Sequence, residues 1–327
     1  MIISTVDRWN PDETVIHRAS QILGSGGLVA FPTETVYGLG ANGLDGSAVS
    51  SIFRAKGRPS DNPLILHVGL PDAVSLVAEV NRRARVVMDT LWPGPLTLVL
   101  PARPSVPSEV TAGLFTVAVR MPSHPVALAL LQDCSFPVAA PSANSSGRPS
   151  PTDADAVLTD LGQSVDLIVD GGSTDLGVES TVLDMTGQLP VLLRPGGMPL
   201  ELLRDVVGQV LLPQGAMELR RSPGTRYRHY APVVPLLLWI PDEPFPAREG
   251  IGAYMGMVPP PVVVFRSLVF DSVSAYARGL FAAMRDLERE PVEFIVAQLP
   301  SFEGIGYAVR DRLCRAAGSA VCSKKEG

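Results

Sequence analysis

The sequence predicts an α/β protein with a large domain over residues 1–212, a linker over residues 213–232 and a small domain over residues 233–327. A chain of 327 residues, 46% of them hydrophobic, is long enough for two cores. Short apolar runs alternate with segments of helical periodicity throughout. The charge balance also changes, from 13 basic and 21 acidic residues up to residue 212 to 14 and 12 beyond it.

Within the large domain, apolar residues at helical spacing predict helices and continuous or alternating apolar runs predict strands. The first helix, for example, carries Val15, Ile16, Ala19, Ile22 and Leu23 and ends at Gly24. Helices are expected at residues 12–24, 72–81, 84–91, 125–131, 153–161 and 200–207, with another directly before Arg54. Strands are expected at residues 28–31, 64–68, 96–100, 115–121, 137–140, 167–169, 181–184 and 191–194. Polar loops follow several strands, which indicates a site at one edge of the sheet.

The small domain reads as an α/β/α unit by the same criteria. Its strands are expected at residues 233–240, 262–265 and 294–299, and its helices at residues 272–288 and 304–317. The last helix carries Arg310, Arg312 and Arg315 on a basic face.

The run from Phe31 to His67 contains most of the unusual chemistry. Gly38, Gly40 and Gly43 formally match the GxGxxG pattern of dinucleotide-binding proteins. The acidic residue that such a site needs about 20 residues later is missing, because that region holds Lys56, Arg58 and Asp61 in a polar loop. The dinucleotide interpretation is therefore disfavoured.

Cations of this acidic part of the chain are concentrated in Gly-, Pro- and Ser-rich motifs. They are Arg54, Lys56, Arg58, Arg120, Arg148 and Arg194. This distribution predicts that they face one ligand with several negative charges, such as a nucleoside triphosphate. For Lys56 and Arg58 the alternative is a cation pair that complements the dipole at a helix C-terminus.

Other polar residues leave two interpretations open. Ser142, Asn144, Ser145 and Ser146, beside Gly147, could hold a nucleotide or could be ordinary turn residues. His67 ends an apolar strand, where a structural histidine is more common than an acid–base. Glu179 and Ser180 could cap a strand or position a substrate. The linker, with Arg220, Arg221, Arg226, Tyr227, Arg228, His229 and Tyr230, could be a solvated tether or could touch the ligand.

Composition excludes several classes of protein. A net charge of −6 argues against a protein that simply coats nucleic acid. No apolar run has the roughly 18 residues of a membrane helix, and the N-terminus has no signal-peptide pattern, so a cytoplasmic protein without membrane contact is expected.

Eight motifs, in this order, resemble the YrdC-like family. They are FPTETVYGLGA, KGRPSDNPL, WPGPLT, VAVRMPSHPVA, PVAAPSANSSGRPSPT, DGGSTDLGVESTV, LLRPGG and SPGTRYRHYAP. Together they cover about residues 10–232 and are similar to the two-domain long form, the L-threonylcarbamoyladenylate synthases. The resemblance implies a twisted mixed sheet with a large concave, cationic site, plus a smaller Rossmann-like α/β/α C-terminal domain.

The resemblance also implies a reaction. ATP, L-threonine and bicarbonate would give threonylcarbamoyl-AMP and pyrophosphate, and a downstream complex would pass the threonylcarbamoyl group to tRNA. Mg²⁺ is expected on the ATP phosphates, without dedicated protein ligands.

Site residues follow from the matching motif positions. L-threonine would be held by Thr35, His67, Arg120, the backbone of Ala140, and Ser180. ATP would be held by Arg58, Asn62, Thr116, Ser142, Asn144, Ser150, Arg194 and Tyr230, with Lys56 and Arg58 beside the reacting groups. His229 and Tyr230 belong to a segment that resembles a lid, and they are expected to help close the pocket over a labile carbamate.

One region departs from the family pattern, since residues 240–262 are short and Pro-rich where a crossover helix is expected.

Two rival interpretations of the function remain. A carbamoyl transferase of hydrogenase maturation would need zinc-finger segments, for which the three cysteines are too few. An RNA-binding module is supported only by the arginines of residues 220–228 and 310–315.

Overall fold

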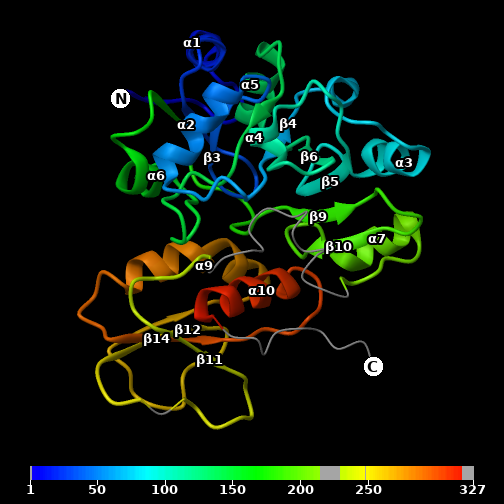
Figure 1. Cartoon of the computed structure of the whole chain (residues 1–327). Coiled ribbons are helices and arrows are strands. Elements are labelled where there is room, and N and C mark those ends of the chain that lie inside the picture. Colours follow the sequence, from blue (N-terminus) through cyan, green and yellow to red (C-terminus); the bar gives the residue numbers. More distant parts are fainter. Residues whose placement is uncertain (1, 214–228, 247, 319–327) are drawn as a thin grey trace.

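The computed structural model describes residues 2–213, 229–246 and 248–318, which form two lobes (Figure 1). The N-terminal lobe contains a ten-stranded sheet and the C-terminal lobe a four-stranded sheet. The ten strands, in their order across the sheet, are β1 (Ile2–Thr5), β8 (Leu167–Asp170), β2 (Val29–Phe31), β3 (Gly38–Asn42), β7 (Val138–Ala139), β4 (Ile65–His67), β6 (Thr116–Arg120), β5 (Leu96–Pro101), β9 (Thr181–Asp184) and β10 (Val191–Arg194). The predicted fold class is confirmed.

The large sheet is mixed. β4 runs parallel to β6 and β5 parallel to β9, whereas β5 and β6 pair in antiparallel fashion. In the register of β4 and β6, His67 lies opposite Arg120. Two sequence segments more than 50 residues apart thereby bring an imidazole and a guanidinium to neighbouring strand ends.

Helices cover the two faces of this sheet unequally. One face packs against α2 (Gly46–Lys56), α3 (Arg82–Leu91), α6 (Ala154–Leu161) and α7 (Leu200–Val207) in the main core. The other face packs against α1 (Glu13–Gly24) and α5 (Pro125–Asp133), but only over β1, β8, β2 and the adjoining strands. The remaining strands, from β4 to β10, bury only a small apolar cluster on that side, formed by Ile65, Val99, Ala118, Val182 and Leu193. This half of the face is free to form the floor of a site.

The C-terminal lobe has a parallel sheet. Its order is β11 (Leu236–Trp239), β14 (Phe294–Gln298), β12 (Gly252–Gly256) and β13 (Arg266–Val269). Helices α9 (Val273–Leu287) and α10 (Gly306–Ala317) pack together on one face. On the other face, Trp239, Tyr254 and Phe294 pack against Phe245 and Val264 from connecting segments. Within the described residues the third layer of the expected α/β/α unit is therefore made of loops, in the Pro-rich region that departs from the family pattern.

Several predicted elements differ in the structure. No strand was expected between Gly38 and Gly43, but residues 38–42 form β3, paired with β2 and β7. A side chain at Gly40 would lie within 3.2 Å of atoms of Phe31, Val138 and Val29, so this glycine permits close strand packing. Residues 71–76 form a 3-10 helix (η1, Pro71–Leu76) in place of the α-helix expected at 72–81. β1 and β12 were not predicted, and β13 begins just after the strand expected at 262–265. A short helix, α4 (Ser108–Thr111), precedes β6.

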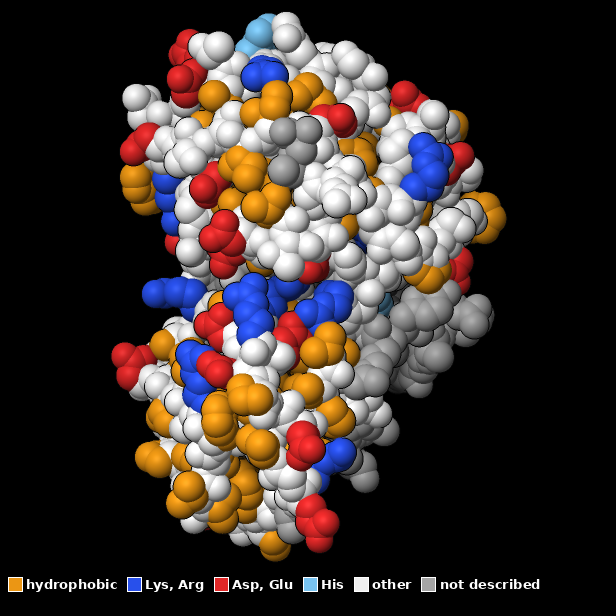
Figure 2. All heavy atoms as spheres, turned by 90° about the vertical axis from the view of Figure 1, so that its left-hand side faces the viewer, with side chains coloured by type: hydrophobic (Ala, Val, Ile, Leu, Met, Phe, Trp, Pro, Cys, Tyr) orange, Lys and Arg blue, Asp and Glu red, His pale blue; other side chains and the backbone are white. Residues whose placement is uncertain are grey.

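Buried charges join the two lobes. Arg285 of α9 pairs with Asp160 of α6 at 2.7 Å, and Arg148 pairs with Glu288. Figure 2 shows Lys, Arg and acidic side chains gathered at the level where the lobes meet. Gly177 approaches the carbonyl of Ala277 so closely that a Cβ would lie 2.4 Å from the oxygen, and its φ of +71° also favours glycine.

We expect Arg285→Ala to lower the free energy of unfolding by about 3–5 kcal/mol, because it leaves the Asp160 carboxylate buried without its partner. The Arg285 side chain is 6% exposed and the Asp160 side chain 6%. Urea denaturation measures this loss. Arg289→Ala, just past the end of α9 and 63% exposed, is the control and should cost less than about 1 kcal/mol. Equal effects of the two changes would contradict the role of the buried pair.

Among the described residues, no helix is both long and apolar enough to cross a membrane. Of the predicted linker, Arg220, Arg221, Arg226, Tyr227 and Arg228 lie outside the described residues, whereas His229 and Tyr230 are described and buried.

Candidate active site

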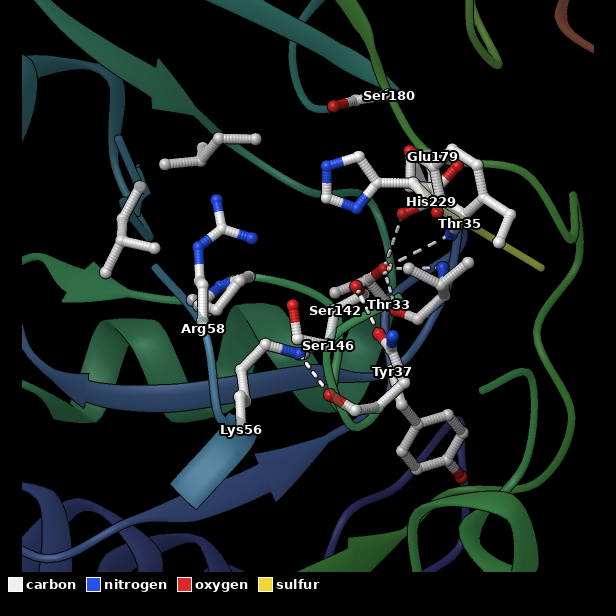
Figure 3. A pocket seen from close by; sticks show the side chains of 18 of the residues that line it. Thr33, Thr35, Tyr37, Lys56, Arg58, Ser142, Ser146, Glu179, Ser180 and His229 are labelled. Carbon is white, nitrogen blue, oxygen red and sulfur yellow. Dashed lines mark hydrogen bonds between the residues drawn. The ribbon is translucent and has the colours of Figure 1, made fainter. Parts of the chain in front are cut away.

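A pocket with about 740 Å³ of empty space, its open mouth included, lies over the uncovered half of the large sheet. Its lining comes from strand ends and loops of the N-terminal lobe and from residues 229 and 230. Figure 3 shows Lys56 and Arg58 on one side of this space and Glu179 and His229 across from them. The polar residues of the lining are Thr33, Thr35, Tyr37, Lys56, Arg58, His67, Arg120, Ser142, Asn144, Ser146, Arg148, Glu179, Ser180, Arg194, His229 and Tyr230.

The end of α2 positions the first two cations. Gly57 caps this helix in the left-handed conformation, with φ 60°, so that the chain turns between Lys56 and Arg58. The buried Lys56 ammonium donates to the carbonyl oxygens of Ser142, at 2.6 Å, and Asn144. Arg58 donates through Nη2 to the carbonyl of Pro63 at 3.1 Å. The two cations are therefore held by backbone oxygens and have no described carboxylate partner of their own.

Burial and the charges of neighbouring arginines lower the pKa values of these two cations. Burial, followed by the charge of Arg58, lowers the pKa of Lys56 well below its usual value. Burial and the charge of Arg194 lower the pKa of Arg58 to about 10. Because an anionic ligand would relieve both effects, the pocket favours a polyanion.

A second group of residues surrounds the end of β6. Arg120 is buried, forms an ion pair with Glu34 at 2.6 Å and donates to Thr35 Oγ1 at 2.9 Å. His67 lies opposite in the register of β4, and burial and the charge of Arg120 lower its pKa to about 3. This imidazole is therefore neutral at physiological pH and can donate and accept one hydrogen bond each.

The third group is at the start of β9. Arg194 donates through Nη2 to the carbonyl oxygen of Ser180 at 2.9 Å and to its Oγ at 3.2 Å. Ser180 Oγ also lies 2.8 Å from Thr97 Oγ1. Glu179, the adjacent residue, accepts a hydrogen bond from Ser150 and pairs with Arg312 of α10 at 2.6 Å. A guanidinium and a hydroxyl are thus fixed together in the pocket wall.

We expect the neutral His67 to make stability depend on pH. The unfolded imidazole takes a proton below about pH 6.5 while the folded one stays neutral to about pH 3, so stability is lost as pH falls through that window. At pH 5 the contribution is about 2 kcal/mol, from 1.5 pKa units at about 1.4 kcal/mol each. Urea denaturation of the parent and of His67→Gln at pH 7.5 and 5 measures it. His67→Gln should lose less stability on acidification, and an identical loss in both proteins would contradict the prediction.

Most site residues predicted from sequence line this pocket. Asn62 and Ser150 do not, but lie behind the wall: the Asn62 carbonyl accepts a hydrogen bond from Arg58 at 3.3 Å, and Ser150 donates to Glu179. Thr116 is half-buried and is outside the lining. It shares the strand face of Arg120 but is four residues away, about 13 Å along β6, so only an extended ligand would reach both.

One cation of the predicted cluster is not part of the site. Arg54 is exposed on α2 and donates to Ser51 Oγ at 2.9 Å. Because Arg54 is two residues before Lys56 on the helix, its side chain points to a different face of α2. Cations in one sequence motif therefore do not all face the same site.

The pocket also involves residues that sequence reasoning missed. Glu34, next to Thr35 in the FPTETVYGLGA motif, holds Arg120 from behind. Tyr37 donates to the carbonyl of Gly172 at 2.7 Å. From the C-terminal lobe, Arg312 pairs with Glu179 and Phe281 stacks on Tyr230. The basic face expected on the last helix is not a free surface at Arg312, which is 0% exposed.

Carboxylates suitable for a metal are scarce. Among the residues that the structure describes, no group of three or more His, Cys, Asp or Glu side chains could hold a metal ion. Glu179 in the pocket wall is already paired with Arg312. The described part of the protein therefore offers no metal cage of its own.

The fold and site define a class of two-lobed α/β proteins with a cationic pocket that is suited to a small polyanion. Comparison with family models specifies that class. A model described as "Telomere recombination" and named for Sua5, YciO and YrdC matches residues 21–196. A second model, "Threonylcarbamoyl-AMP synthase, C-terminal domain", matches residues 198–318.

Similar proteins agree with these models along the whole chain. A threonylcarbamoyl-AMP synthase of Pyrococcus abyssi is 43% identical, over 95% of this chain and 96% of its own length. A threonylcarbamoyl-AMP synthase of Bacillus subtilis is 41% identical, over 98% and 97%. The crystal structure of P. abyssi Sua5 complexed with L-threonine superposes with a TM-score of 0.90 at 41% identity, covering 97% of this chain and 98% of that one. The chain belongs to the threonylcarbamoyl-AMP synthase family.

The first rival interpretation is a hydrogenase-maturation enzyme. The structure of full-length HypF resembles this chain with a TM-score of 0.50 at 20% identity, covering 56% of this chain and 30% of that one. At that identity the likeness shows a shared fold only.

Proposed function

We propose that this protein condenses L-threonine, bicarbonate or CO₂ and ATP into threonylcarbamoyl-AMP and pyrophosphate. The observation that carries the proposal is the convergence of Lys56, Arg58, Arg120 and Arg194 on one pocket that also contains hydroxyl and amide groups. In the proposed reaction, the threonine amine takes up CO₂ to form a carbamate. A carbamate oxygen attacks the α-phosphorus, the bond from that phosphorus to the bridging oxygen breaks, and pyrophosphate leaves.

The triphosphate would lie against Lys56, Arg58 and Arg194. Phosphoryl and nucleotidyl transfer need positioned reactants and neutralised charge more than covalent help. The nucleotide would be positioned directly by Ser142 and Asn144, which line the pocket, and indirectly by Ser150 and Asn62, which lie behind its wall. Thr116 would contact its far end. Ser142 Oγ, which donates to Asn144 Oδ1 at 2.6 Å, already fixes the orientation of that amide.

Threonine would bind at the end of β6. Its carboxylate fits the Arg120 guanidinium, and its hydroxyl and amine fit the groups of Thr35, His67, Ser180 and the Ala140 backbone. The neutral state of His67 matters, because a charged imidazolium would not accept a hydrogen bond from the amine.

The reaction would also require a metal ion on the ATP phosphates and a pocket closed to water. Mg²⁺ would bind to the phosphates of ATP, where it would neutralise part of the negative charge. His229 and Tyr230 would limit the access of water to the carbamate.

We further propose a catalytic domain over residues 1–212, a linker over residues 213–232 and a C-terminal domain over residues 233–327. The protein would be cytoplasmic, and a downstream complex would transfer the threonylcarbamoyl group to tRNA.

Pyrophosphate release tests the function. The protein is incubated with ATP, Mg²⁺, bicarbonate and one amino acid at a time, and the product is identified by mass spectrometry. The proposal predicts release that depends on threonine and bicarbonate, with a product mass equal to the sum of AMP, threonine and CO₂ less one water. RNA binding without turnover would instead support the RNA-binding interpretation and overturn the proposal.

A further inference from the structure

We propose that Arg312, on α10 of the C-terminal lobe, is a positioning residue for the nucleotide pocket because it fixes Tyr230 and Glu179 from behind the wall. The inference rests on the proposed synthase function. It assigns the C-terminal lobe a task in nucleotide binding through one side chain that does not itself line the pocket.

Arg312 contacts two separate parts of the wall. Its Nε donates to Glu179 Oε2 at 2.6 Å, and its guanidinium carbon lies 5.3 Å from the centre of the Tyr230 ring. Glu179 lies two residues before β9, whereas Tyr230 lies about 50 residues later in sequence. One fully buried guanidinium therefore fixes the distance between two wall residues that no local structure connects.

Tyr230 needs such support. Its φ of 67° lies in the left-handed region, which is unfavourable for a residue with a large side chain and persists only where the surroundings hold it. Its ring lies against Phe281 of α9, with 5.4 Å between ring centres, as well as near Arg312. The next residue, Ala231, donates to the carbonyl of Gly147, which also lines the pocket. Phe281 and Arg312 together hold the aromatic ring that would close the nucleotide site.

Glu179 needs a partner for a different reason. An unpaired carboxylate in this wall would repel the phosphates that Arg58 and Arg194 attract. Burial alone would raise the pKa of Glu179, but Arg312 and Arg194 hold it below its usual value. The charged and titratable groups that face Glu179 are Arg312, Arg194, Tyr230 and His229. Without Arg312 the pKa of Glu179 should rise, and nucleotide binding should weaken as pH increases and the carboxylate ionises.

Arg312→Met tests the inference. We expect the KM for ATP to be about tenfold above the parent value at pH 7 and to increase with pH in a titration from pH 5 to 9, with a smaller change in kcat, while the parent shows no such increase. Arg312 also pairs with Asp311, but that carboxylate keeps Arg315 at 2.8 Å. The double variant Glu179→Gln, Arg312→Met removes the carboxylate that is left without a cation beside the pocket, and it should lose the added pH dependence. Arg312→Lys retains the charge and should show a raised KM with little pH dependence, which provides the test should Arg312→Met fail to fold.

Arg310→Met is the matched control. Arg310 is on the same helix, donates to the carbonyl of Pro300 and lies over Phe302, outside the pocket. It should leave the KM for ATP unchanged. If Arg312→Met lowers thermal stability but retains the parent KM and pH profile, or if Arg310→Met has an equal effect, Arg312 is only structural. Calorimetric binding of ATP to the same proteins separates this failure from a failure of the proposed reaction, because it requires no turnover.

Discussion

Replacing Lys56 or Arg58 by alanine should lower threonine-dependent pyrophosphate release by about 10²–10³-fold. Both cations are held in the pocket by backbone carbonyls, and removal of one preorganised electrostatic group from a reaction centre typically has an effect of this size. Burial lowers the pKa of each, together with the charge of Arg58 for Lys56 and of Arg194 for Arg58, so the bound triphosphate, not a protein carboxylate, is their expected counter-charge. Steady-state kinetics with a coupled pyrophosphate assay measures the effect.

Arg54→Ala is the control for this prediction. Arg54 is on the same helix, α2, but its side chain is exposed and donates to Ser51 Oγ. Its loss should leave both turnover and the unfolding midpoint close to those of the parent. Turnover near the parent value in both Lys56→Ala and Arg58→Ala, with folded protein, would contradict the site assignment.

Arg120→Met should raise the KM for threonine by about 100-fold. The buried guanidinium is aligned by Glu34, Thr35 and the Gly94 carbonyl, and a carboxylate bound to it would gain charge-assisted hydrogen bonds. Titration of threonine at saturating ATP measures the change, and calorimetry without threonine shows whether ATP binding is retained.

The buried partner of Arg120 complicates this variant, so a second one accompanies it. Arg120→Met leaves the Glu34 carboxylate unpaired, which is destabilising in itself. Glu34→Gln, Arg120→Met removes that charge and should recover stability without recovering threonine affinity. A double variant with the parent KM for threonine would show that Arg120 supports the fold and does not bind the substrate.

The sequence predicted the residues that line the pocket better than it predicted the sheet around it. Lys56, Arg58 and Arg194 were found because cations within Gly- and Pro-rich motifs of an acidic domain have few structural explanations. β3 was missed because Gly38 and Gly40 give it no apolar alternation, and its role follows only from how closely Phe31 and Val138 pack against it. Glycine patterns alone do not distinguish a phosphate-binding loop from a closely packed strand.

The C-terminal lobe was harder to predict for a related reason. Residues 262–265 have the apolar composition of a strand, yet β13 starts at Arg266, and Val263 is 101% exposed. Helical periodicity placed Arg310, Arg312 and Arg315 together on one helix but could not show that Arg312 is buried against Glu179. Such contacts join segments more than 100 residues apart, and the spacing within one helix carries no information about them.

A crystal structure with L-threonine and a non-hydrolysable ATP analogue tests the central claim most directly. The claim predicts phosphate oxygens within hydrogen-bond distance of Lys56, Arg58 and Arg194, and the threonine carboxylate at Arg120, all in the one pocket over β4, β6 and β9. Nucleotide bound elsewhere, or these cations still held only by protein groups while threonine and nucleotide are both present, would contradict it.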